Sequence, residues 1–106
     1  MPTEQINDGW TIVEADSQAT IGLTRDLDAD DAFPLRNVLA KVSLDCTELV
    51  FDVANTSYIA HSVQAVIRDE CKMRTVALRG INDRLRRVLR TDKVQLLNVV
   101  VEEPAA

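Results

Sequence analysis

The chain contains few of the residues around which metal, cofactor and catalytic sites are built. It has one histidine, two cysteines and three glycines among 106 residues. His61 cannot complete a zinc site with Cys46 and Cys71, because the two cysteines lie far apart and form no CxxC pair. The three glycines are isolated, so there is no glycine-rich loop to hold nucleotide phosphates. We therefore expect no metal, no cofactor and two free, mostly buried thiols.

Long apolar runs are also absent. None approaches the roughly 18 to 20 residues of a membrane-spanning helix, and the start of the chain lacks the basic and apolar regions of a secretory signal. We expect a soluble, cytoplasmic protein that does not insert into a membrane. Seventeen acidic and twelve basic residues give a net charge of −5, which argues against binding to nucleic acid or to an anionic membrane.

The length and the apolar content favour one domain over residues 1–106. Apolar residues make up 46% and charged residues 27% of the chain, which is a normal balance for a single buried core. A polar lead at residues 1–9 and a short tail at 102–106 flank the patterned part of the sequence. We found no internal repeat and no linker.

The apolar pattern predicts alternating strands and helices. Apolar stretches at 10–13 and 19–23 flank a turn-forming segment and predict a β-hairpin, and β-branched stretches predict buried strands. The β-branched stretches lie at 48–53, 75–78 and 96–101, where we expect three further strands. Three sets of apolar residues recur at the spacing of a helix and predict three helices. They are Ala32, Leu35, Val38, Leu39 and Val42; Val63, Val66, Ile67 and Cys71; and Ile81, Leu85, Val88 and Leu89.

This order of elements implies parallel crossover connections after the hairpin. The expected fold class is α/β, with a small mixed sheet of about five strands. An N-terminal hairpin and βαβαβ winding would form the sheet, and about three helices would lie mainly on one face.

The acidic segment at 26–31 resembles the opening of a calcium-binding loop but departs from it at two positions. The sixth position is Asp31 where the loop needs glycine, and the twelfth is Asn37 where a bidentate glutamate belongs. We therefore exclude calcium binding here. Asp28, Asp30 or Asp31 is instead expected to cap the first helix.

The third predicted helix gives the C-terminal third a basic surface on an acidic protein. Its basic residues and their neighbours are Arg79, Arg84, Arg86, Arg87, Arg90 and Lys93. Two interpretations stay open. The surface could dock an acidic partner, or it could be a solvated helix face on which Asp83 pairs with Arg87 for about 0.3 to 0.5 kcal/mol.

Three stretches, 23–28, 49–59 and 76–85, together resemble one known family. Their sequences are LTRDLD, LVFDVANTSYI and VALRGINDRL. In this order and spacing they resemble the STAS domain, the fold of bacterial anti-sigma-factor antagonists. The same domain occurs in sulfate transporters and in a cytoplasmic subunit of phospholipid-transport ABC systems. The resemblance covers about residues 10–101.

The resemblance draws attention to the turn before the second helix. The family's Asp-Ser-Ser-Gly-Leu falls on Ala60, His61, Ser62, Val63 and Gln64, so His61 replaces the phosphate-accepting Ser or Thr. In regulatory members, phosphorylation at this turn adds about two negative charges to the surface on which a kinase partner docks. Ser62 is the candidate phosphosite here, although it lies about 100° further around the helix.

The residues and the resemblance lead to three hypotheses of function. The first is a non-enzymatic protein–protein interaction module, resembling an anti-sigma-factor antagonist, that binds an anti-sigma-factor kinase-like protein and has a degenerate phosphorylation turn. The second is an accessory subunit that binds the ATPase of a phospholipid-transport ABC system. The third is a small enzyme with His61 as general base, which would need a carboxylate or hydroxyl within about 3 Å. We favour the first, without enzymatic activity.

The predicted contact surface lies at the turn after the central strand, where open α/β sheets place their binding surfaces. Its residues are Tyr58, Ile59, Ala60, His61 and Ser62, with secondary contacts at Asp26, Asp28, Arg84 and Arg87. His61 itself has three interpretations: a local structural role, a partner contact, or ligation and catalysis. An adjacent His61–Ser62 pair does not form a catalytic dyad, because neighbours on a helix point in divergent directions. The oligomeric state is left open.

Overall fold

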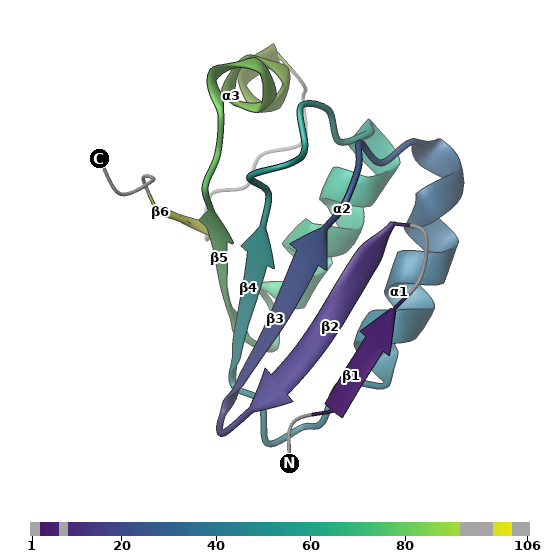
Figure 1. Cartoon of the computed structure of the whole chain (residues 1–106), viewed down its shortest axis with the longest axis vertical. Helices are drawn as coiled ribbons and strands as arrows, with labels where there is room; N and C mark the ends of the chain where they lie inside the picture. Colours follow the sequence, from purple (N-terminus) through teal and green to yellow (C-terminus); the bar gives the residue numbers. More distant parts are fainter. Residues whose placement is uncertain (1–2, 7–8, 92–98, 103–106) are drawn as a thin grey trace.

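The computed structural model describes residues 3–6, 9–91 and 99–102. Its strands form one mixed sheet whose spatial order follows the chain, β1-β2-β3-β4-β5-β6 (Figure 1). The strands are β1 Thr3–Ile6, β2 Trp10–Ala15, β3 Gln18–Leu23, β4 Glu48–Asp52, β5 Thr75–Arg79 and β6 Val99–Glu102. β1, β2 and β3 pair antiparallel, and β3 to β6 pair parallel. The predicted mixed α/β sheet is therefore confirmed.

The predicted hairpin is formed by β2 and β3. Their pairing continues as far as Ala15 opposite Gln18, so only two residues make the turn. One of them, Asp16, has a φ of 57°, a left-handed conformation that aspartate adopts more readily than most residues. Both strands extend further toward the turn than the apolar pattern predicted, because ladder pairing includes polar residues that carry no hydrophobic signal.

The sheet has six described strands rather than about five. The additional strand, β1, lies inside the polar lead at 1–9 and pairs antiparallel with β2, from Thr3 opposite Glu14 to Ile6 opposite Thr11. A four-residue strand is too short to show a period-two pattern, and its pairing depends on the free edge of β2. β6 begins at Val99; the earlier part of the strand predicted at 96–101 lies outside the described residues.

In the described residues, three α-helices and one short 3-10 helix connect the parallel strands. They are η1 Ala29–Asp31, α1 Ala32–Ala40, α2 His61–Glu70 and α3 Asp83–Thr91. α1 and α2 lie side by side across one face of the sheet, and α3 lies beyond the carboxyl end of β5 (Figure 1). The aspartate cap predicted for the first helix lies one element earlier, because Asp28 caps η1 while Asp31, the N-cap residue of α1, makes no side-chain cap hydrogen bond. The side chain of Asp28 accepts from the Asp30 amide, and Asp31 completes a capping box.

The hydrophobic core lies between the sheet and the helices. Alternate residues of β3 are buried, and three consecutive residues are buried in β4 and again in β5, as expected for central parallel strands. Fully buried large side chains include Ile21, Leu35, Leu39, Leu49, Phe51, Ile67, Leu78 and Leu85. In the described part of the chain, no helix combines the length and the apolar character needed to cross a bilayer.

Candidate functional site

Three loops meet at one edge of the sheet. β3, β4 and β5 are parallel neighbours, so the loops after their carboxyl ends lie next to one another, and η1, α2 and α3 begin from these loops (Figure 1). We call the exposed side chains of these loops and helix starts the carboxyl-edge surface. Its residues are Asp26, Asp28, Asp30, Tyr58, His61, Ser62, Arg84 and Arg87.

The loop after β3 and the loop after β4 are joined by backbone hydrogen bonds. Leu27 and Ile59 form an isolated parallel bridge. The Leu27 amide donates to the Tyr58 carbonyl at 3.1 Å, and the Ala60 amide donates to the Leu27 carbonyl at 2.9 Å. Leu27 and Ile59 are fully buried, so each anchors its loop in the core. The backbone of Tyr58 is therefore held in place from the neighbouring loop.

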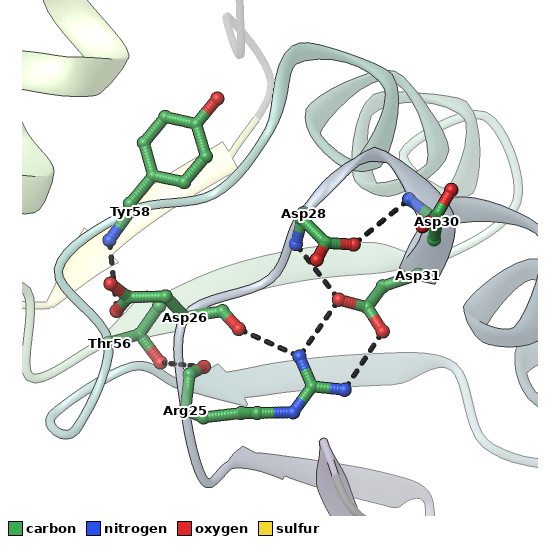
Figure 2. A network of polar contacts seen from close by, with 7 residues as sticks. All are labelled: Arg25, Asp26, Asp28, Asp30, Asp31, Thr56 and Tyr58. Atoms are coloured by element: carbon green, nitrogen blue, oxygen red, sulfur yellow. Dashed lines mark hydrogen bonds and ion pairs between the residues drawn. The ribbon is translucent and has the colours of Figure 1, made fainter.

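Asp26 holds the same turn through its side chain. Its Oδ1 accepts a hydrogen bond from the Ser57 amide at 2.7 Å. It also accepts one from the Tyr58 amide at 3.3 Å (Figure 2). A carboxylate that accepts backbone amides forms charge-assisted hydrogen bonds, which are stronger than neutral ones. Asp26 was predicted as a secondary contact, and the structure gives it a second role in positioning Tyr58.

Arg25 and Asp31 form the polar centre of the loop after β3. The guanidinium donates to both carboxylate oxygens of Asp31, at 2.9 and 3.0 Å, and to the Asp26 carbonyl at 2.9 Å (Figure 2). Asp31 also accepts from the Asp28 amide at 2.8 Å. The hydrogen bond from Arg25 lowers the pKa of Asp31 below its ordinary value of 3.8, although burial opposes the shift.

Replacement of Asp31 by asparagine is expected to destabilise the protein at neutral pH. The loss should be about 1.5 to 3 kcal/mol, the range for hydrogen bonds to charged groups. Because the pKa of Asp31 is lowered on folding, its contribution is present above the unfolded pKa and is lost as the pH falls through the folded pKa. The deficit of the variant in urea unfolding should therefore shrink below about pH 4.

The matched control is Asp30→Asn in the same turn, because the side chain of Asp30 is exposed. This control should change the free energy of unfolding by less than about 0.5 kcal/mol. Equal effects of the two substitutions, or a deficit at Asp31 that does not depend on pH, would contradict the role given to the Arg25–Asp31 pair.

Thr56 bonds the loop after β4 to both neighbouring loops, after β3 and after β5. The buried hydroxyl of Thr56 donates to the Arg25 carbonyl at 3.3 Å, and the Asn82 side-chain amide donates to the Thr56 carbonyl at 2.8 Å. Asn82 Oδ1 in turn accepts a hydrogen bond from the Leu85 amide at 2.9 Å and so caps the start of α3. Gly80, with a φ of 78°, provides the turn that brings Asn82 to this position.

These roles of Arg25, Thr56 and Asn82 were not predicted from the sequence. A signal existed for Asn82, since asparagine three residues before an apolar helix position is a typical N-cap. No local pattern indicates Arg25 or Thr56, because their partners are 6 and 31 residues away in sequence.

The structure brings some of the predicted contact residues to the surface and buries others. Tyr58 is 45% exposed, and His61 and Ser62 are exposed as the first two residues of α2. Ile59 and Ala60 belong to the core instead, with exposures of 0% and 5%. Their burial follows from the bridge to Leu27, and it narrows the predicted contact turn to three side chains.

The secondary contacts also lie at the surface. Asp26 and Asp28 are exposed on the loop after β3, and Arg84 and Arg87 are exposed on α3. The loop after β4 separates the two pairs, so they lie toward opposite ends of the carboxyl-edge surface.

His61 is exposed at the start of α2, whose N-cap residue is Ala60. In residues 9–91, no hydrogen bond joins its imidazole to a carboxylate or hydroxyl, and the described chain holds no cluster of metal-binding side chains. The carboxylate or hydroxyl that the enzyme hypothesis placed beside His61 is therefore not among the described hydrogen bonds of this residue.

Comparisons with known proteins give structural similarity only. No protein-family model and no curated protein sequence matches the chain. The unphosphorylated form of the anti-sigma factor antagonist SpoIIAA is similar with a TM-score of 0.65 and 10% identity, over 97% of this chain and 88% of that chain. A Thermotoga maritima protein assigned as an anti-sigma factor antagonist is similar with a TM-score of 0.73 and 14% identity, over 88% and 86%.

A third similar structure is that of Mglu, with a TM-score of 0.52 and 14% identity over 88% of this chain but 19% of that chain. At these identities the similarity concerns the fold. The chain has a STAS-like fold, as the resemblance of its three stretches predicted.

Proposed function

We propose that the chain is a non-enzymatic protein-interaction module that acts in the manner of an anti-sigma-factor antagonist and binds its partner through the carboxyl-edge surface. The observation that supports this most is the placement of Tyr58. Its side chain is 45% exposed, while its backbone is held by Asp26 and by the bridge between Leu27 and Ile59. The two antagonists with the same fold support the general class.

The arrangement suits binding because little has to be ordered when a partner arrives. Association costs free energy for each loop and side chain that it immobilises, and this loop is already bonded to both neighbouring loops. Tyrosine is enriched at protein interfaces because it combines a large apolar ring with a polar hydroxyl. His61 and Ser62 lie beside it on the first turn of α2.

We further propose that the phosphorylation turn is degenerate. His61 takes the position of the family's phosphoacceptor, and an imidazole cannot receive a phosphate directed at serine. Ser62 is the remaining hydroxyl in the first turn of α2 and is exposed. A phosphate there would be favoured by the positive end of the helix dipole, which keeps Ser62 as the candidate phosphosite.

Affinity purification from the host cell tests the proposal. The wild-type chain should recover a protein partner, and Tyr58→Ala should reduce recovery at least about tenfold, as for a central interface aromatic. His61→Asp should also reduce recovery, because it places a carboxylate in the contact surface. Lys72→Ala, 78% exposed beyond the far end of α2, is the control and should recover the partner normally.

Mass spectrometry of the same eluates distinguishes the partner classes. A kinase-like protein would support the antagonist function, whereas an ABC ATPase would replace it with the transport function. Phosphate found on Ser62 would show that the turn is still regulated. Recovery of no partner, or equal recovery by wild type and Tyr58→Ala, would overturn the proposal.

A further inference from the structure

The carboxyl-edge surface has charges of opposite sign at its two ends. Residues 25–31, after β3, contain four aspartates and one arginine, a net charge of −3. α3, after β5, contains four arginines and one aspartate, a net charge of +3. The sheet order β3-β4-β5 places Tyr58 and His61 between them. The acidic end, the aromatic centre and the basic end therefore follow one another along a single edge.

We propose that a second copy of this chain binds the carboxyl-edge surface and forms a two-fold symmetric dimer. In such a dimer the same patch meets itself, so that each residue i that contacts j is matched by j contacting i. A two-fold axis lying in the interface near Tyr58 and perpendicular to the row of charges places the acidic end of each copy against α3 of the other. The two exposed tyrosines then face each other near the axis.

The charge layout favours a second copy over other anionic ligands of α3. A nucleic acid or an anionic lipid surface would be attracted by the arginines but repelled by the −3 segment on the same edge and by the net charge of −5. A suitable partner has to present both signs in the matching order. The carboxyl-edge surface of a second copy meets this requirement, because a two-fold rotation reverses the order of its acidic and basic ends.

The location of the dimer interface rests on the proposed function, because both use the carboxyl-edge surface. The dimer would in turn affect that function. Self-association would cover Tyr58, His61 and Ser62, so a host partner would have to compete with the second copy. Because exposed charges supply the complementarity, association should be weak and sensitive to salt. The free surface would then be most available at low protein concentration or high ionic strength.

Sedimentation velocity of the full chain tests the inference directly. We expect a monomer–dimer equilibrium at low salt that shifts to monomer as sodium chloride is added. Asp30→Lys and Arg84→Glu should each weaken the dimer at least about fivefold at low salt. Lys72→Glu, just beyond the far end of α2, is the control for a change in net charge and should leave the dimer intact.

A mixture of the two charge-reversed variants provides the decisive measurement. In a mixed dimer, one copy carries Asp30→Lys and the other carries Arg84→Glu. The lysine at position 30 of the first copy then faces the glutamate at position 84 of the second, while the other acidic and basic ends keep their wild-type residues and face each other as before. Mixing two weakly associating variants should therefore restore dimerisation to near the wild-type level. A monomer at every concentration, an equilibrium insensitive to salt, or a mixture that stays monomeric would overturn the dimer.

The two proposals can fail separately. Sedimentation uses the purified chain alone and reports only self-association, while affinity purification reports host partners. A host partner without a dimer overturns only this inference, and a dimer without a host partner overturns only the proposed function.

Discussion

Replacement of Arg74 by methionine is expected to lower the free energy of unfolding by about 3 to 5 kcal/mol. The Arg74 side chain is only 5% exposed and pairs with Glu70, 8% exposed, at 3.1 Å. It also donates to the Cys46 carbonyl at 2.9 Å and to the Val42 carbonyl at 3.1 Å. Without Arg74, a carboxylate and two carbonyls lose their donor in a place that water reaches poorly, which is the costly case for a buried ion pair.

The same variant should show a characteristic pH dependence. Burial raises the pKa of Glu70 above its ordinary value of 4.5, and Arg74 opposes that shift. Loss of Arg74 should raise the pKa further, so the folded variant takes up a proton at a pH where the unfolded chain does not. A group whose folded pKa is raised stabilises the fold as the pH falls. The deficit of the variant should therefore shrink on acidification toward pH 4.5.

Urea unfolding followed by the fluorescence of Trp10 measures both effects, because Trp10 is the single tryptophan and is buried. Arg68→Met, at a 48% exposed position on α2, the helix that carries Glu70, is the control and should cost no more than about 1 kcal/mol. A loss at Arg74 as small as that at Arg68 would show that the pair contributes little.

Phe51→Ala should destabilise the protein by a similar amount, about 3 to 5 kcal/mol. Phe51 is fully buried in β4, between the β3 and β5 partners Ile21 and Leu78, which are also buried. Removal of the ring takes away apolar burial and leaves a cavity that a central strand cannot close by moving.

The control is the same substitution at Phe33, whose side chain is 71% exposed on the first turn of α1. It should change the free energy of unfolding by less than about 0.5 kcal/mol. Comparable losses at Phe51 and Phe33 in urea unfolding would contradict the assignment of the core to the helix-covered face of the sheet.

The parts of the fold that were predicted correctly depend on local signals. Three consecutive apolar residues in β4 indicated a strand buried on both faces, and helical spacing indicated α1 and α2. Asp28 was one of three aspartates expected to cap the first helix, and it caps the short helix η1 that leads into α1. In each case the residues that form the signal are within a few positions of one another.

The candidate site was predicted only in outline. The turn after β4 was located correctly at the edge of the sheet, because parallel strands place their following loops together. Which side chains of the turn are exposed was not predictable. Ile59 and Ala60 are buried through a bridge to Leu27, which lies 32 residues earlier than Ile59, and no local pattern shows such a pairing.

The amino-acid sequence by itself determined the α/β class, the hairpin, the positions of the helices and the resemblance to STAS domains, because hydrophobic period and turn residues act over short distances. The tertiary structure decided the rest. It added β1 to the edge of β2, bonded Asp26 to the turn that holds Tyr58, and set acidic and basic segments at opposite ends of one surface. These features depend on contacts between residues far apart in the chain, which become neighbours only when the strands pair.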